Sequence, residues 1–321
     1  MPNVLLLGGA GYLGTAIGQA LRRTGVHDVW ATTRDAKKKN VLLSNEIHPL
    51  VGDLSDRNFV ETSIAAYRID VVVDISQAYT DATTVLEAVR NAASSRKAAL
   101  HKDGAVGPKL GFIYGSGQWV HGNTGDERIS DTMVPGTSLA VGKPGTAVGW
   151  RPGHEQAVLA AQELLDVAIL RPSSIYGRGS WIFNTWWDPI LASAQSGHAT
   201  PVRIPATKSS LTGLVHVEDA AEGYVAAIAR LGTLGSWPVF DLHVESVRID
   251  DMLTEVARVL GAGGEIVYAG TQGNPFFEAV ALSAHSSGAR AKAVLGWAPR
   301  QVDFMRELPT TVAAWKAAKE L

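Results

Sequence analysis

Short runs of apolar residues alternate with stretches at helical spacing over the first half of the chain. Runs such as 4–7 and 71–73 are apolar throughout, as is typical of parallel strands covered on both faces. Leu13, Ile17 and Leu21 lie four residues apart, which predicts an amphipathic helix directly after the first run. The strands predicted in this half, with their exits, are residues 4–7, 27–35, 46–51, 71–76, 109–114 and 167–170. This alternation predicts right-handed crossovers and a doubly wound parallel sheet of the α/β class.

A glycine-rich turn separates the first predicted strand from the first predicted helix. Glycine allows a tight turn and a close approach to a pyrophosphate, and a helix N-terminus offers free N–H groups and positive potential. Strand, turn and helix together predict a dinucleotide site, although a lone glycine pattern would also fit an ordinary turn. The residues expected to hold the cofactor here are Gly8, Gly11, Tyr12, Leu13 and Gly14.

The end of the second predicted strand bears on which cofactor is bound. In a dinucleotide fold this strand ends at the adenosine ribose, where an acidic residue favours the free 2′-hydroxyl of NAD. The sequence instead has Thr32 and Thr33, then Arg34, with lysines at 37–39. A guanidinium suits a 2′-phosphate, so Arg34 predicts a preference for NADP(H) over NAD(H). Each lysine alone fits a solvated face better than a phosphate contact.

Composition excludes several classes of protein. The 321 residues carry a formal net charge of −2, so no general basic surface indicates nucleic acid or an anionic membrane. Cysteine is absent, which excludes disulfides, thiolate catalysis and cysteine-ligated zinc. No apolar run approaches the roughly 20 residues of a membrane span, and the nine histidines show no metal-ligand spacing. We therefore expect a soluble, cytoplasmic protein with a small-molecule substrate and no metal.

Four motifs together are similar to those of one protein family. They lie at residues 8–14, 171–177, 215–221 and 289–299, and the first has the spacing Gly-x-x-Gly-x-x-Gly. They resemble the extended and atypical short-chain dehydrogenase/reductases, which are NAD-dependent epimerase/dehydratase-like proteins. The resemblance implies a Rossmann-type sheet of about seven strands with a smaller C-terminal substrate lobe. Members are often dimers, so it leaves a homodimer open.

The resemblance also implies a division of the chain. Residues 1–176 would form mainly the dinucleotide-binding domain and 177–321 mainly the substrate lobe, with 212–243 returning to the first domain.

The resemblance implies further cofactor contacts at three loops. Their residues are Asp53 and Leu54 at the adenine, Ser76 after the fourth strand, and Pro172, Ser173 and Ser174 beside the nicotinamide.

The resemblance fails at the catalytic residues. Matching the flanking motifs puts Gly117 at the usual catalytic Ser or Thr, Ala147 at the tyrosine and Arg151 at the lysine. No Tyr-x-x-x-Lys occurs between residues 116 and 176. Pro152 removes a donor and fixes its own φ, so we expect the helix of this region to begin near residue 151.

Substitute catalytic and substrate groups are therefore hypotheses. The catalytic candidates are Arg151, Ser116, His154 and Tyr176, and the substrate candidates are His121, Trp181, Trp186 and Trp187. Arg151 would bond the nicotinamide ribose and stabilise charge on a substrate oxygen, or it would only pair with Glu155 one turn on. The tryptophans fit a bulky or aromatic substrate and core packing equally well.

Two classes of function remain open. The first is an NADP(H)-binding oxidoreductase that acts on a small carbonyl or alcohol with a non-standard catalytic set. The second is a cofactor-binding protein without net hydride transfer, either a non-redox isomerase or cyclase or a nucleotide-sensing regulator.

Overall fold

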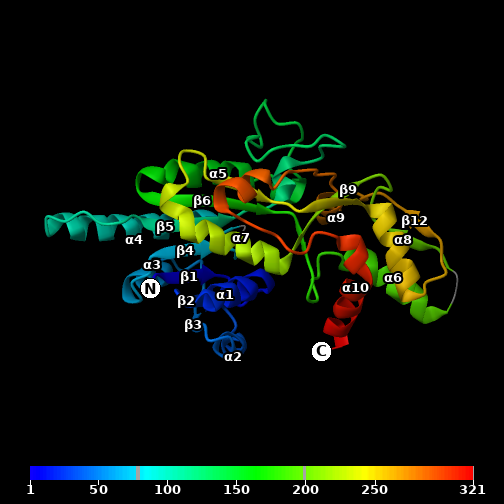
Figure 1. The fold of residues 1–321 in the computed structure, drawn as a ribbon, viewed down its shortest axis with the longest axis horizontal. Helices are drawn as coiled ribbons and strands as arrows, with labels where there is room; N and C mark the ends of the chain where they lie inside the picture. The colour runs from blue at the N-terminus through cyan, green and yellow to red at the C-terminus, as the bar shows by residue number, and fades with distance from the viewer. Residues whose placement is uncertain (77–79, 198–199, 321) are drawn as a thin grey trace.

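The computed structural model describes residues 1–76, 80–197 and 200–320, and its main feature is a seven-stranded parallel sheet (Figure 1). The strands are ordered β10-β6-β5-β4-β1-β2-β3. Their bounds are β1 Asn3–Leu7, β2 Asp28–Thr33, β3 His48–Val51, β4 Val71–Asp74, β5 Leu110–Gly115, β6 Leu165–Pro172 and β10 Val239–Leu242. The predicted α/β class and doubly wound parallel sheet are confirmed.

Helices cover both faces of this sheet because its strands are apolar on both sides. Val4 and Leu6 of β1 face one core, and the alternate residues Leu5 and Leu7 face the other. The first core includes helices α1 (Tyr12–Thr24) and α7 (Val217–Arg230). The second includes α3 (Arg57–Ala66), α4 (Ala82–Lys102) and α5 (Arg151–Ala160), while α2 (Lys39–Ser44) follows β2.

A smaller lobe is built from separated segments of the second half (Figure 1). It contains a three-stranded sheet, β11-β9-β7, and a two-stranded parallel sheet, β12-β8. Its strands are β7 Ser174–Tyr176, β8 Val202–Ile204, β9 Leu211–His216, β11 Glu245–Arg248 and β12 Ile266–Tyr268. Its helices are α6 Asn184–Ser196, α8 Ile249–Leu260, α9 Pro275–Val280 and α10 Phe304–Glu320. Between these segments the chain returns to the large sheet as α7 and β10.

Short turns of helix connect the main elements. They lie at Ala36–Lys38, Gln118–His121, Thr146–Val148, Ala161–Glu163, Leu231–Thr233 and Ala291–Leu295. Helix α5 begins at Arg151 with Pro152 in its first turn, as the sequence predicts. In the part of the chain that the structure describes, no helix has the length and apolar character needed to cross a bilayer.

Two of the tryptophans expected at the substrate belong instead to the core of the lobe. Trp186 and Trp187 are 0% and 1% exposed and pack with Phe183, Phe304 and Trp315. Their rings contact Phe183 at centroid distances of 5.6 and 5.2 Å. Of the two readings of this aromatic segment, core packing is correct for these residues, because α6 turns both side chains away from the cavity described below.

Candidate functional site: a cavity between the sheet and the lobe

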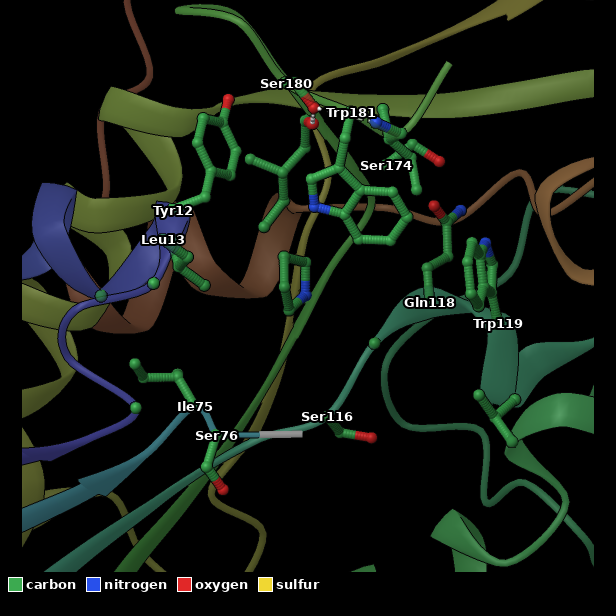
Figure 2. Close-up of a pocket in the computed structure, with 18 of the residues that line it drawn as sticks. Tyr12, Leu13, Ile75, Ser76, Ser116, Gln118, Trp119, Ser174, Ser180 and Trp181 are labelled. Carbon is green, nitrogen blue, oxygen red and sulfur yellow. Dashed lines mark hydrogen bonds between the residues drawn. The ribbon is translucent and has the colours of Figure 1, made fainter. Parts of the chain in front are cut away.

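A cavity of about 620 Å³ lies where the strands of the large sheet end and the lobe begins. Its lining comes from the glycine-rich turn, from the ends of β2, β4, β5 and β6, from the start of α5 and the turn before it, and from six lobe residues. The lobe residues are Ser174, Ile175, Ser180, Trp181, Ile182 and Phe276. Figure 2 shows Tyr12 and Leu13 of α1 at one end and Gln118 and Trp119 at the other. This is the crevice, outside the carboxyl ends of parallel strands, in which α/β proteins bind ligands.

The glycine-rich turn has no room for side chains. A Cβ on Gly14 would lie 2.6 Å from the oxygen of Gly8, and a Cβ on Gly8, whose φ is +83°, would lie 2.7 Å from the Cα of Ser76. The N–H of Gly11 donates to the oxygen of Gly8 at 3.0 Å, and that of Gly8 donates to Thr32 Oγ1 at 3.0 Å. The backbone is thus held close to the cavity at the start of α1. This arrangement fits the pyrophosphate of a dinucleotide.

The end of β2 brings positive charge to the same cavity. Arg34 and Lys38 line it, as do Thr32 and Thr33, and no carboxylate is among its described lining residues. Sequence reasoning singled out Arg34 and treated the neighbouring lysines as equivalent. The structure distinguishes Lys38 from the other two, because the short helical turn after β2 brings this one to the cavity.

The expected adenine contacts, Asp53 and Leu54, are not part of this lining. The carboxylate of Asp53 accepts from the N–H and the hydroxyl of Ser55 at 3.0 and 2.9 Å. These bonds, with a smaller contribution from the charge of Arg34, lower the pKa of Asp53. Leu54 is buried in the core below α3. In this structure the two residues therefore act as a turn cap and a core residue.

Arg151 lies at the end of β5, which β4 and β1 separate in the sheet from β2, the strand that Arg34 follows. It is 5% exposed, and its Nη1 donates to the oxygen of Gly115 at 3.2 Å, while Nε has no partner among the described residues. The interpretation that Arg151 pairs with Glu155 is wrong. Glu155 binds Arg171 of β6 through both carboxylate oxygens, at 3.0 and 2.5 Å. The guanidinium of Arg151 is thus directed toward β5 and the cavity.

Two serines, Ser76 and Ser116, lie near each other at the ends of adjacent strands, as Figure 2 shows. Ser116 directly follows Gly115, whose oxygen accepts from Arg151. Ser116 follows β5, is 8% exposed, and has an Oγ with no partner in the described structure. Ser76 follows β4, and its Oγ donates to the buried Asp74 at 2.6 Å. Burial raises the pKa of Asp74, and the hydrogen bonds from the N–H and the hydroxyl of Ser76 and the charge of Arg151 oppose this rise. The hydroxyl of Ser116 can therefore donate a hydrogen bond to a bound molecule.

Three other candidates, His121 as a substrate contact and His154 and Tyr176 as catalytic groups, do not line the cavity, which corrects their expected positions. His121 is fully buried, with Nε2 2.8 Å from the carboxylate of Asp241. His154 packs edge-on against the ring of Tyr114, and burial lowers its pKa. Tyr176 is 2% exposed among the rings of the lobe, and burial raises its pKa. Each is buried by elements distant in the sequence, which local motifs do not reveal.

An aromatic rim closes the lobe side of the cavity. Trp181, which is 51% exposed, stacks on Phe276 at a centroid distance of 6.0 Å, and Trp119 meets Phe276 edge-on at 6.1 Å. Gln118 lies next to this rim and donates to the backbone oxygen of Ala284. Sequence reasoning found Trp181 but missed Trp119 and Phe276. Trp119 lies two residues after Gly117, the position matched to the catalytic Ser or Thr, whereas no local signal marks Phe276.

The cavity and the fold agree with comparisons to known proteins. Residues 4–134 match the model of the NAD dependent epimerase/dehydratase family. No curated protein matches the chain. A solved structure of dTDP-glucose 4,6-dehydratase from Bacillus anthracis with NAD is 14% identical, with a TM-score of 0.70, over 100% of this chain and 98% of that one.

Two solved UDP-glucose 4-epimerases have the same fold. The one from Thermus thermophilus, in complex with NAD, is 19% identical with a TM-score of 0.69, over 98% of this chain and 99% of that one. The one from Thermotoga maritima, with UDP-glucose, is 18% identical with a TM-score of 0.71, over 99% of both chains. The family resemblance is confirmed over residues 4–134, where the chain matches the family model, and over its whole length the chain shares the fold of these solved structures.

Proposed function

We propose that this protein binds NADP(H) in the cavity and is an oxidoreductase for a small, uncharged carbonyl or alcohol substrate. One observation carries the proposal: a single cavity joins the glycine-rich turn to the buried Arg151 and to the hydroxyl of Ser116. When bound, the cofactor supplies a hydride to a carbonyl carbon or removes one from an alcohol. The chain's own residues then have to hold the substrate and manage the charge on its oxygen.

The preference for NADP(H) rests on the charge at the end of β2. Arg34 and Lys38 offer two cations to a 2′-phosphate, and no described lining carboxylate competes for them or binds a ribose diol. The Bacillus and Thermus proteins are solved with NAD. This chain differs from an NAD-preferring pattern at the tip of β2, where threonines replace an acidic residue.

The substrate class follows from the aromatic rim. Trp119, Trp181 and Phe276 present ring faces and edges, and the described lining of the lobe side carries no cation. A nucleoside diphosphate sugar needs positive charge for its pyrophosphate. The rim therefore favours an uncharged, bulky or aromatic molecule over the UDP-glucose bound by the Thermotoga epimerase.

Arg151 and Ser116 would act on the substrate oxygen. A buried guanidinium stabilises negative charge that develops on that oxygen, and Ser116 can donate a hydrogen bond to it. Arginine keeps its proton at neutral pH, so Arg151 acts as an electrostatic and positioning group. Ala147, at the family's tyrosine position, also lines the cavity and offers no phenol.

The same feature favours a second candidate, a protein that binds the cofactor without net hydride transfer. Near Arg151, the described lining residues Ser116, Gly117, Ala147 and Val148 include no phenol, imidazole, ammonium or carboxyl group that could exchange a proton with a substrate. A non-redox isomerase or cyclase, or a sensor of the NADP(H) pool, would not need one.

Titration with NADPH and turnover of a carbonyl library separate these candidates. Turnover with bulky aromatic carbonyls supports the oxidoreductase, tight binding without oxidation supports the second candidate, and absence of binding overturns both. Arg151→Ala should lower kcat/KM on the order of 10²-fold with an unchanged melting temperature. Arg203→Ala, which removes an exposed arginine of β8, is the matched control and should leave kcat/KM unchanged.

A further inference from the structure

A hydrogen-bonded chain of three side chains leads away from the cavity wall. Ser173 lines the cavity, and its Oγ lies 2.9 Å from Nδ1 of His243. The other ring nitrogen, Nε2, lies 3.3 Å from Oγ of Ser246. Ser173 and His243 are each 4% exposed, whereas Ser246 is partly exposed. The chain therefore connects the cavity to a residue that solvent reaches.

The sheet itself positions these three groups. Strands β6 and β10 pair in parallel and end with Pro172 opposite Leu242. The residues that follow the two strands, Ser173 and His243, therefore leave the sheet side by side. The N–H of Ser173 donates to the oxygen of Leu242 at 3.1 Å, which fixes the two exits relative to each other. Ser246 then lies on β11, two residues beyond the turn. The pairing of the two backbones therefore fixes the positions of Ser173 and His243 relative to each other.

His243 is held as a neutral imidazole. Burial lowers its pKa to about 4, and the charge of Asp241 opposes this shift while His285, Arg128 and Lys292 add to it. A neutral imidazole has one N–H and one free nitrogen lone pair, so it can accept a proton on one nitrogen and give one from the other.

We propose that Ser173, His243 and Ser246 form a proton relay that serves the reaction in place of the missing tyrosine. The inference rests on the oxidoreductase function proposed above. As hydride from the reduced cofactor adds to a carbonyl carbon, the substrate oxygen takes the proton of Ser173. Ser173 takes the proton of His243 Nδ1, Nε2 takes that of Ser246, and Ser246 takes one from water.

The net reaction consumes one carbonyl, one hydride and one solvent proton and yields an alcohol. His243 is neutral before and after, so no buried charge is left behind. Oxidation of an alcohol runs the same transfers in reverse. Arg151 and the relay have separate tasks, since the first stabilises charge on the oxygen and the second delivers the proton.

The test uses three variants of the full-length protein. Ser173→Ala removes the donor, Ser246→Ala removes the outer hydroxyl, and His243→Asn keeps a hydrogen-bonding group near Ser173 without the second ring nitrogen. Ser193→Ala is the control, because Ser193 is a buried serine of α6 outside the cavity whose Oγ has no partner in the described structure. Each protein is assayed for carbonyl reduction, for NADPH affinity, and by NMR of the His243 ring nitrogens.

A relay predicts that Ser173→Ala and His243→Asn lower kcat on the order of 10²-fold. NADPH affinity should be unchanged in His243→Asn, which lies outside the cavity lining, and should fall far less than kcat in Ser173→Ala. Without any substrate, Ser173→Ala should shift the Nδ1 signal and Ser246→Ala the Nε2 signal, and the ring should stay neutral at pH 7. Near-wild-type kcat in both inner variants, or ring signals insensitive to both serines, overturns the relay and leaves the oxidoreductase standing. Cofactor binding with no turnover in the wild type overturns the oxidoreductase function, and the relay with it.

Discussion

The cavity has a cofactor end, at the glycine-rich turn of residues 8–14, and a proposed reaction end, at Ser116, Gly117 and Arg151. The two ends are constrained in different ways, although the same sheet builds both. At the cofactor end the backbone is packed so closely that a Cβ on Gly14 would lie 2.6 Å from backbone atoms. At the reaction end, a Cβ on Gly117 would find its nearest neighbour, the oxygen of Pro172, 3.9 Å away. Gly117 also has an extended backbone with φ of −176°, which any residue adopts. Glycine is thus required by geometry at the first position and not at the second.

The difference indicates that the proposed cofactor binding and the proposed chemistry depend on separate features of this fold. The cofactor end depends on backbone shape, so its sequence has to keep particular glycines. The reaction end depends on which side chains project from the ends of β5 and β6 and from the start of α5. Those side chains can change while the sheet and the cofactor cradle stay the same. The resemblance that places Ala147 and Arg151 at the family's tyrosine and lysine thus concerns the end of the cavity where side chains, and not the backbone, set the shape.

The largest expected effect concerns the ion pair beneath the reaction end. Glu155→Gln leaves the guanidinium of Arg171 buried without its bidentate partner, and the charges of Asp241, at 3.9 Å, and of Asp131 compensate only part of its charge. Breaking a buried pair costs about 3–5 kcal/mol, so we expect a loss of roughly 3 kcal/mol in the free energy of unfolding. Urea unfolding measures it. Glu163→Gln, at an exposed position of the following turn, should change stability by less than about 0.5 kcal/mol.

If Glu155→Gln costs less than about 1 kcal/mol, the pair does not hold α5 against β6 as the geometry indicates. NADPH affinity of the folded variant should remain near the wild-type value. Unchanged NADPH affinity would show that the two ends are independent, because the Glu155–Arg171 pair joins β6 to α5, the helix that carries Arg151, and does not contact the glycine-rich turn.

The second effect tests the cofactor end directly. Gly14→Ala places a methyl group against the backbone of Gly8 and Gly9, which must shift to make room. We expect NADPH affinity to fall at least about 100-fold, measured by fluorescence titration. Gly153→Ala is the matched control, since its Cβ would meet nothing within 4 Å and lies on a helix. That variant should bind normally and be slightly more stable. Wild-type affinity in Gly14→Ala would show that the cradle tolerates movement.

The sequence predicts the glycine-rich turn and the helix after it because their requirements are local. The strand, the glycine spacing and the helix lie within about twenty residues, and period and composition alone indicate them. The alternation of strands and helices likewise predicts the doubly wound sheet, and Pro152 predicts where α5 begins. Each of these signals arises from neighbours in the chain, so it can be read without knowing the tertiary contacts.

The reaction end is not local, and there the sequence misleads. His121 is removed from the cavity by Asp241, which is 120 residues away, and Glu155 is taken from Arg151 by Arg171. Ser173 gains its partner 70 residues further along the chain. Hydrophobic patterning also fails to separate aromatic residues of a core from those of a cavity, as Trp187 shows. Only the packing of the lobe decides these cases.

The third effect concerns the charge at the cofactor end. Arg34→Ala removes one charge-assisted contact with a 2′-phosphate, which is worth about 1.5–3 kcal/mol. NADPH affinity should fall by roughly tenfold or more, while NADH affinity should barely change. Calorimetric titration of both cofactors measures the two effects. Equal losses for both, or a wild-type preference for NADH, would contradict the assignment of Arg34 to the phosphate.

The smallest expected effect is the sharpest test of the contrast between the two ends. Gly117→Ser restores the residue type that the family resemblance places here, at an extended position with open space around the new Cβ. Replacing an unconstrained glycine lowers the entropy of the unfolded chain, so stability should be unchanged or rise by up to about 1 kcal/mol. NADPH affinity should stay within about twofold of wild type. Thermal melts and the same fluorescence titration measure both. Should Gly117→Ser destabilise the protein or abolish binding as Gly14→Ala does, the reaction end is constrained by its backbone too, and the separation of binding from chemistry fails.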